Sequence, residues 1–194
     1  RVLVFFGGDD LENFTGRTLD ALMDPSLSHL NVDVVLGSHT PHRHTVLDQI
    51  SHRPLTTFHE NLPSLAGLIA RSDLAIGAGG ATTWERACLG IPSIVVAVAD
   101  NQLPFAQALD KAGFLQLLGT SENVSVDLIR QTLLAALKAP ILHNGISLTD
   151  GRGAFRIATA ILGPSYPLNL RPAIASDENL LIRWDNYCQS RSNT

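Results

Sequence analysis

The sequence predicts an α/β protein built around a parallel sheet of about six strands, with helices on both faces. Short apolar runs rich in valine, leucine and isoleucine alternate with longer stretches whose apolar residues recur at helical spacing. The opening run, Val2–Phe6, is apolar throughout, which is typical of a strand that is buried on both faces of a parallel sheet. Several of them end in glycine or small polar residues before the next helix begins. Together these features predict a Rossmann-like, doubly wound fold.

The alternation runs from residue 2 to about residue 140. Strands are expected at Val2–Phe6, Val32–Leu36, Leu55–Phe58, Leu74–Ile76, Ser93–Val98 and Leu115–Leu118. The helices between and after them are expected at Asn13–Met23, Arg43–Ile50, Leu65–Ala70, Thr82–Leu89, Pro104–Lys111 and Val126–Leu137, with a further helix at Ala154–Ile161.

The length of 194 residues fits one main domain with a short remainder. We expect the main domain to cover residues 1–162. Residues 163–167 read as a linker because they include Gly163, Pro164 and Pro167. Residues 168–194 are too few to bury a core of their own, so they predict only the start of a second domain.

Composition narrows the class of partner. A formal net charge of −4 and the absence of a lysine or arginine run argue against nucleic acid. No apolar run approaches the ~18 residues that span a bilayer. The two cysteines, Cys88 and Cys188, fit neither a metal spacing nor a disulfide framework, which favours a reducing, cytoplasmic setting. Because Arg1 is followed at once by a strand, the chain is expected to begin inside a longer polypeptide.

The loops after the strands are where an open parallel sheet binds ligands. The first contains the adjacent glycines Gly7 and Gly8, which let the backbone approach an anion, followed by Asp9 and Asp10. The next helix would offer its free N–H groups, so a phosphate would fit there. A tight turn that binds no ligand is the alternative.

The second loop, from Gly77 to Glu85, is the richest in glycine. Its backbone amides, with Thr82 or Thr83, could bind a diphosphate. It is not the dinucleotide fingerprint, because Thr82 replaces the third glycine, and NAD binding therefore has little support. Glu85 has two interpretations: its carboxylate accepts hydrogen bonds from the ribose hydroxyls, or it completes a capping box with the N–H of Thr82.

The third loop places Asp100, Asn101 and Gln102 after a buried strand, where their side chains could bind sugar hydroxyls and phosphate oxygens. The alternative is that Asp100 or Asn101 caps the following helix.

His59 follows the third predicted strand, a position that suits ligand contact better than catalysis. His39, His42 and His44 share one loop, but no cysteine or carboxylate pair completes a metal site, so no metal is expected. The sequence has neither the glycine-serine-glycine elbow nor the zinc-binding helix motif of hydrolases.

Several segments together resemble a known family. They are Phe6-Gly7-Gly8-Asp9, Phe58-His59-Glu60-Asn61, Arg71 to Ile76, Gly79 to Glu85, Gly90-Ile91-Pro92-Ser93, Ala99 to Gln102 and Asp150 to Ala154. Residues 1–162 resemble the C-terminal domain of the UDP-sugar hydrolases of pseudaminic acid biosynthesis, which are also described as spore-coat-polysaccharide-type predicted glycosyltransferases. That family is related to the lipid II-forming N-acetylglucosaminyltransferase and has the glycosyltransferase-B architecture.

The resemblance implies a ligand and roles for individual residues. The ligand would be UDP-2,4-diacetamido-2,4,6-trideoxy-β-L-altropyranose or a close relative, hydrolysed without metal or cofactor to UDP and the free 2,4-diacetamido-2,4,6-trideoxyhexose. Glu85 would bind the ribose, the loop of His59, Asn61 and Leu62 the uracil, and Asp100, Asn101 and Gln102 the sugar. The diphosphate would lie against the glycine-rich loops, at Gly8, Gly80, Ala81 and Thr82, and Asp9 and Gly79 are further expected ligand-binding residues.

No catalytic residue is expected in this chain, because the family's catalytic histidine belongs to an N-terminal domain that the sequence lacks. This chain alone is therefore predicted to bind UDP or a UDP-sugar weakly and to hydrolyse nothing. Two other functions stay open: the donor-binding domain of a UDP-sugar glycosyltransferase, and a binding module without enzymatic activity.

The last segment resembles the start of a GCN5-related acetyltransferase domain. The match rests on Leu170, Arg171, Pro172, Ala173, Asp177, Leu181 and Trp184. The acetyl-CoA pyrophosphate loop of such enzymes is absent, so this piece would be a truncated domain without activity.

Overall fold

A computed structural model of the chain describes residues 1–138 and 145–162. The predicted linker at 163–167 and the acetyltransferase-like segment 168–194 lie outside the described residues. Compactness divides the chain into two units, Arg1–Gly151 and Arg152–Thr194. The predicted domain end at residue 162 stays a prediction.

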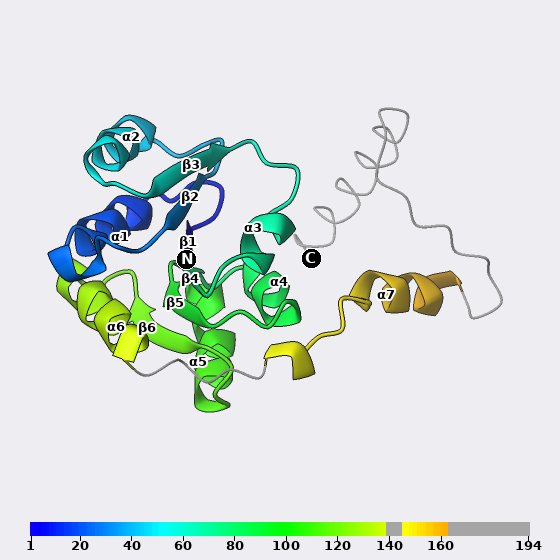
Figure 1. The fold of residues 1–194 in the computed structure, drawn as a ribbon. Coiled ribbons are helices and arrows are strands. Elements are labelled where there is room, and N and C mark those ends of the chain that lie inside the picture. The colour runs from blue at the N-terminus through cyan, green and yellow to red at the C-terminus, as the bar shows by residue number, and fades with distance from the viewer. Residues whose placement is uncertain (139–144, 163–194) are drawn as a thin grey trace. The chain divides into compact units, whose positions relative to one another are not determined.

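The first unit is a six-stranded parallel sheet with the strand order β3-β2-β1-β4-β5-β6 (Figure 1). The strands are β1 (Val2–Phe5), β2 (Val32–Leu36), β3 (Thr56–Glu60), β4 (Leu74–Ala78), β5 (Ser93–Ala97) and β6 (Gln116–Thr120). The α-helices are α1 (Phe14–Leu22), α2 (Arg43–His52), α3 (Ala66–Ala70), α4 (Thr82–Cys88), α5 (Leu103–Lys111), α6 (Val126–Lys138) and, in the second unit, α7 (Gly153–Leu162). Short 3-10 turns lie at η1 (Pro25–Leu27), η2 (Asp100–Gln102) and η3 (Gly145–Ser147). The predicted α/β fold is confirmed.

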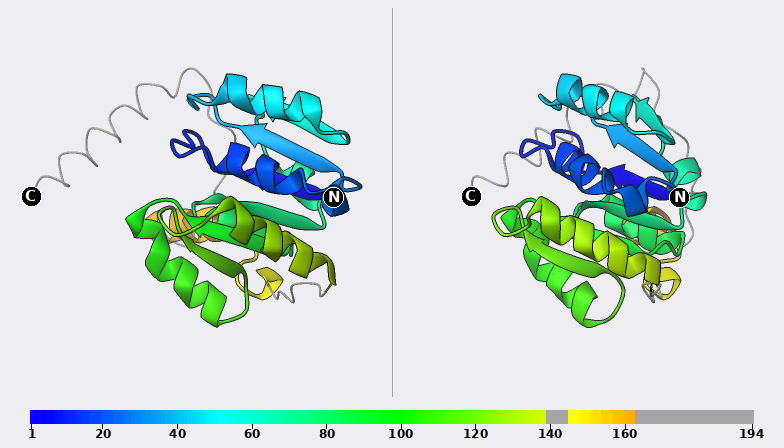
Figure 2. Two further views of the ribbon diagram at one scale, coloured as in Figure 1. Left: turned by 90° about the vertical axis from the view of Figure 1, so that its left-hand side faces the viewer. Right: turned by 60° about the vertical axis from the view of Figure 1, so that its left-hand side comes forward.

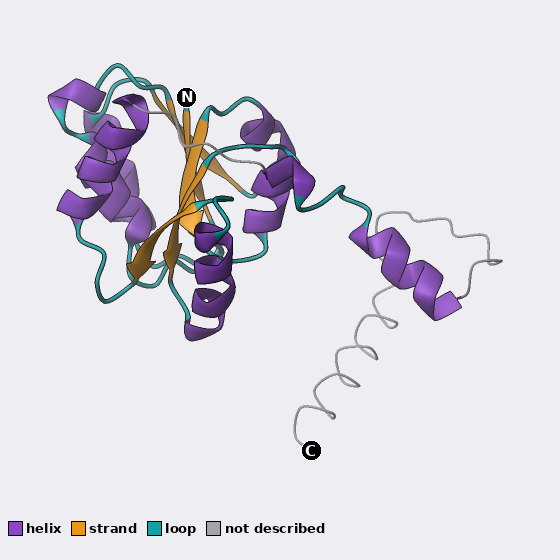
Figure 3. Ribbon diagram, turned by 90° about the horizontal axis from the view of Figure 1, so that it is seen from below, coloured by secondary structure: helices purple, strands orange, loops and turns teal. Residues whose placement is uncertain are grey.

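Side chains of β1 alternate between two apolar layers. Val2 and Val4 pack with Phe14 of α1 in the larger core cluster, whereas Leu3 packs with Ile69 of α3 on the opposite face. Helices α1, α2 and α6 cover the first face, with α1 between the other two, as the left view of Figure 2 shows. Helices α3, α4 and α5 cover the second, so the sheet lies between two helical layers (Figure 3).

Three strands extend further than the sequence predicts. In β6, Gly119 and Thr120 continue the strand and pair with the end of β5. Gly77 and Ala78 belong to β4, because both pair with β5 and Gly77 also pairs with Phe5 of β1. His59 and Glu60 belong to β3, where they pair with the end of β2. The predicted placing of His59 after its strand is therefore wrong. All three strands continue because a neighbouring strand supplies ladder hydrogen bonds that local composition does not reveal.

The strand order reverses between β1 and β4. After β1 the chain builds outward through β2 and β3, and then returns to place β4 on the other side of β1. The loops after β1 and β4 therefore leave the sheet in opposite directions and open a crevice between them at the carboxyl ends of the strands. No helix of the described part of the chain is long and apolar enough to cross a membrane.

Candidate functional site

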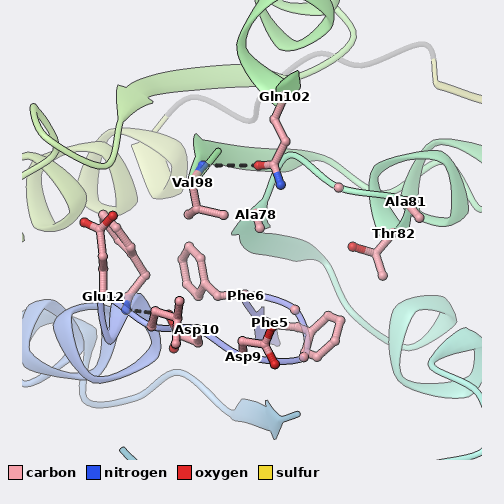
Figure 4. A pocket seen from close by; sticks show the side chains of 15 residues that line it. Phe5, Phe6, Asp9, Asp10, Glu12, Ala78, Ala81, Thr82, Val98 and Gln102 are labelled. Atoms are coloured by element: carbon pink, nitrogen blue, oxygen red, sulfur yellow. Dashed lines mark hydrogen bonds between the residues drawn. The ribbon is translucent and has the colours of Figure 1, made fainter. Parts of the chain in front are cut away.

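A cavity of about 480 Å³ opens at this reversal point (Figure 4). Its volume is in the range of small-ligand sites. Its walls come from the ends of β1 and β4, the loops after β1, β4 and β5, and the first residues of α1 and α4: Phe5, Phe6, Gly7, Gly8, Asp9, Asp10, Leu11, Glu12, Phe14, Ala78, Gly80, Ala81, Thr82, Val98 and Gln102. The three loops chosen from the sequence therefore meet at one site.

The cavity gathers some of the predicted ligand-binding residues and leaves others outside. Those that line it are Gly8, Asp9, Gly80, Ala81, Thr82 and Gln102. Those that do not are His59, Asn61, Leu62, Gly79, Glu85, Asp100 and Asn101. Their predicted roles stay predictions.

The turn between β4 and α4 has unused backbone donors. Among the described residues, the N–H groups of Gly80, Ala81 and Thr82 have no hydrogen-bond partner, whereas the next two amides close tight turns onto Gly80 and Ala81. The N-cap residue, Ala81, provides no side-chain cap. Three consecutive donors at the edge of the cavity are thus available to an acceptor.

The capping box considered for Glu85 does not form. Helix α4 begins at Thr82, so Glu85 is the fourth helical residue rather than the third, one position too far along to reach back to the N-cap. Its side chain is exposed and makes no hydrogen bond within the described part of the chain. The carboxylate is therefore accessible to a ligand.

The start of α1, in contrast, is closed. The Asp10 carboxylate accepts hydrogen bonds from the N–H groups of Phe14 (2.8 Å) and Thr15 (2.9 Å), and Asn13 accepts from Gly16 (3.1 Å). The expectation that this helix offers free N–H groups to a phosphate is therefore wrong, because the protein's own side chains occupy them. Burial raises the pKa of the Asp10 carboxyl, although its hydrogen bonds to Thr15 and Phe14 act in the opposite direction.

In the loop after β5, Gln102 holds the turn together. Its Oε1 accepts a hydrogen bond from the N–H of Val98 at 3.1 Å, the contact drawn in Figure 4. Asp100 and Asn101 are exposed, and neither the η2 turn nor α5 has a side-chain cap, so the capping alternative for these two residues is wrong. Asp100 lines a second, smaller cavity of about 110 Å³ with Thr120, Ser121 and Glu122.

His59 belongs to an ionic cluster that the sequence analysis missed. The Asp33 carboxylate is fully buried and contacts His59 Nε2 (2.7 Å), Arg71 Nη2 (2.6 Å) and Arg1 Nη1 (2.9 Å). Burial raises the pKa of Asp33, but hydrogen bonds from His59, Arg1 and Arg71 outweigh it, so the pKa is lowered overall. The sequence does contain a sign of this cluster, because a single aspartate inside an otherwise apolar strand indicates a buried charge that needs partners.

The loop after β3, which the resemblance assigns to the uracil, has two notable residues. Asn61 has a positive φ of 54°, and Leu62 is an exposed apolar side chain.

Arg86 of α4 is a second buried charge that the sequence analysis missed. It is 2% exposed, and its Nη2 donates to the carbonyl of Ala78 (2.9 Å) and to the hydroxyl of Thr83 (3.0 Å). Burial lowers its pKa to about 10, against the opposing effect of Glu85.

The loop histidines find other partners. His39 Nδ1 lies 3.8 Å from Asp9 Oδ1, and His42 Nε2 lies 2.8 Å from the carbonyl of Leu11. Residues 1–138 and 145–162 contain no group of three or more metal-ligating side chains.

No protein-family model matches the chain. The chain is 33% identical over 171 residues to the spore coat polysaccharide biosynthesis protein SpsG of Bacillus subtilis, covering 85% of this chain and 50% of that protein. An uncharacterized protein of Methanocaldococcus jannaschii is 26% identical over 197 residues, which cover 94% of this chain and 37% of that protein. The UDP-N-acetylglucosamine–N-acetylmuramyl-(pentapeptide) pyrophosphoryl-undecaprenol N-acetylglucosamine transferase of an Exiguobacterium species is 31% identical over 140 residues, or 68% of this chain and 38% of that enzyme. The chain thus spans half or less of the length of these curated relatives.

Solved structures share the fold at low sequence identity. MurG of Acinetobacter baumannii superposes with a TM-score of 0.62 at 14% identity, over 83% of this chain and 49% of MurG. The lipopolysaccharide glycosyltransferase WaaG gives 0.62 at 20% identity, over 84% of this chain and 47% of WaaG. UDP-GlcNAc 2-epimerase from Neisseria meningitidis, bound to UDP-GlcNAc, gives 0.59 at 18% identity, over 83% of this chain and 43% of the epimerase. The chain therefore has the Rossmann-like fold of one half of the glycosyltransferase-B architecture and is a homologue of SpsG over half of that protein's length.

Proposed function

We propose that this chain is the donor-binding domain of a glycosyltransferase-type enzyme that uses a UDP-sugar. The observation that carries the proposal is the row of three unused amides at Gly80, Ala81 and Thr82, on the wall of a cavity at the reversal point of the sheet. Oriented amides that lack a protein partner suit the oxygens of a diphosphate.

The other groups fit the remaining parts of such a ligand. Glu85 is exposed one turn along α4, and its carboxylate makes no hydrogen bond within the described residues, as a ribose-binding group requires. The opposite wall carries Asp9 and Glu12, whose carboxylates would accept hydrogen bonds from sugar hydroxyls. The diphosphate and the ribose would then lie on the β4 side, and the sugar would extend toward the β1 loop.

The relatives favour glycosyl transfer over hydrolysis. One relative is named as an N-acetylglucosamine transferase that uses UDP-N-acetylglucosamine, another as a spore coat polysaccharide biosynthesis protein, and one structural neighbour is bound to UDP-GlcNAc. None of the relatives reported above is named as a hydrolase. We therefore put forward glycosyl transfer in place of the UDP-sugar hydrolase of pseudaminic acid biosynthesis that the motifs resemble.

Catalysis would need a second domain in addition to this donor-binding domain. Because the chain spans 50% of SpsG, we propose that a companion domain of the same polypeptide supplies the acceptor site and the catalytic group, and that this chain alone binds donor without turnover.

The test is a calorimetric and thermal-shift titration of the chain with UDP, with GDP and NAD as controls. UDP at ~100 times its dissociation constant should add about 2.7 kcal/mol to the free energy of unfolding. Glu85→Gln should weaken UDP binding and leave the melting temperature of the free protein unchanged. The matched control is Glu122→Gln, which changes an exposed glutamate in the loop after β6, outside both α4 and the 480 Å³ cavity. Equal stabilisation by UDP, GDP and NAD, or by none of them, would contradict the proposal.

A further inference from the structure

The charges on the wall of the cavity do not suit a diphosphate. The charged side chains that line it are Asp9, Asp10 and Glu12, and no lysine or arginine is among the lining residues. A diphosphate bound there would be repelled by these carboxylates, and amide dipoles alone carry only partial charges. A positive charge from a residue outside the cavity wall is therefore needed to balance the negative charge of the diphosphate.

Arg86 lies directly behind the floor of the cavity. Its guanidinium donates to the carbonyl of Ala78, a residue of the cavity wall. A Cβ added to Gly77 would lie 2.7 Å from Arg86 Nη1 and 2.1 Å from the carbonyl oxygen of Phe5, which also lines the cavity. The guanidinium therefore lies under the ends of β1 and β4, where the strand order reverses.

This buried cation has no carboxylate to pair with. No acidic group lies within 4.0 Å of it among the described residues, and its Nε is buried without a hydrogen-bond partner. Its nearest sequence neighbour of opposite charge, Glu85, is exposed and acts on it only at a distance. An uncompensated charge inside a protein is costly, and an anion that binds nearby offsets that cost.

We infer that the buried charge of Arg86, which lies behind Ala78 of the cavity wall, makes the cavity selective for diphosphates. The inference rests on the proposed function and adds the residue that sets the selectivity. Arg86 lies behind the wall and acts as a positioning residue. Its charge favours UDP over uridine, which shares the base and ribose but has no phosphate.

The test compares UDP with uridine. In Arg86→Met the dissociation constant for UDP should rise about tenfold or more, since an interior charge acts through a low effective dielectric. The dissociation constant for uridine should change less than about twofold. Arg86→Lys keeps the charge and should retain most of the preference for UDP. The matched control is Arg130→Met, which removes the same charge from ion pairs with Asp24 and Asp127, away from the residues of the site, and should leave both constants unchanged.

A second measurement on the unmodified chain covers the case in which Arg86→Met does not fold. The arginine Nε–H resonance of Arg86, assigned from its loss in Arg86→Lys, should shift with UDP and with inorganic pyrophosphate but not with uridine. If the unmodified chain binds no UDP, the proposed function fails. If it prefers UDP, while Arg86→Met keeps that preference or the resonance does not respond, the inference about Arg86 alone is overturned.

Discussion

Gly37, the residue after β2, makes room for the loop that forms one wall of the cavity. A Cβ added to Gly37 would lie 2.1 Å from the carbonyl oxygen of Gly8, 2.3 Å from its Cα and 2.4 Å from its carbonyl carbon. An ordinary contact begins at 3.4 Å, so the loop would have to move by 3.4 − 2.1 = 1.3 Å. Because all three atoms are backbone, no side-chain rotation relieves the clash.

We expect Gly37→Ala to lower the free energy of unfolding by about 1–3 kcal/mol, the usual cost of overpacking. It should also weaken UDP binding, because Gly8 lines the cavity. Urea unfolding measures the first effect and calorimetric titration the second. Gly8→Ala is the control: a Cβ there meets nothing within 4 Å, so stability should stay within about 0.5 kcal/mol of the unmodified chain. Wild-type stability and UDP affinity in Gly37→Ala would refute the reasoning.

Three further predictions concern stability. Asp33→Asn should cost about 1.5–3 kcal/mol at neutral pH, because it removes the buried carboxylate that accepts hydrogen bonds from the partly exposed Arg1 and Arg71. The pKa of Asp33 is lowered in the folded state, so the stability that its carboxylate contributes is complete above the ordinary pKa of 3.8 and is lost as the pH falls through the lowered value. Asp33→Asn has no such contribution to lose. Its free energy of unfolding should therefore fall less between neutral and acidic pH than that of the unmodified chain. Asp10→Ala should cost about 0.5–2 kcal/mol in urea unfolding, through loss of the cap on α1; no change would mean that Asn13 suffices. Gly67→Ala should raise the free energy of unfolding by about 0.5–1 kcal/mol and with it the melting temperature, because Gly67 is exposed within α3 and its added Cβ meets no atom within 4 Å. A lower melting temperature would contradict this prediction.

The order of strands and helices could be predicted because the buried strands are short and mostly apolar and alternate with stretches of helical periodicity. The run Val32–Leu36, for example, was predicted with the bounds that the structure has. The ends of β3 and β4 could not, since they depend on pairing partners that are distant in sequence. The same limit applies to Asp33 and Arg86: each is an ordinary charged residue until the fold brings its neighbours around it.

The site shows the limit of reasoning from loop composition. The loops after β1 and β4 are both rich in glycine, and both precede a helix, so the sequence predicts an anion site at each. In the structure the two loops differ in the side chains near the start of the helix that follows each of them. At α1, Asp10 and Asn13 hold φ values of 40° and 54°, a region that few residues other than glycine adopt, and in that conformation their side chains cap the helix.

At α4 no side chain caps the helix, and Arg86 lies behind the turn. One wall of the cavity is therefore acidic and closed to anions, whereas the opposite wall has free amides with a buried cation behind them. A ligand with a diphosphate at one part and hydroxyls at another, such as a nucleotide sugar, matches both walls in a single orientation. A symmetric polyanion such as pyrophosphate matches only the α4 wall, so it should bind more weakly than UDP even though it carries the same diphosphate.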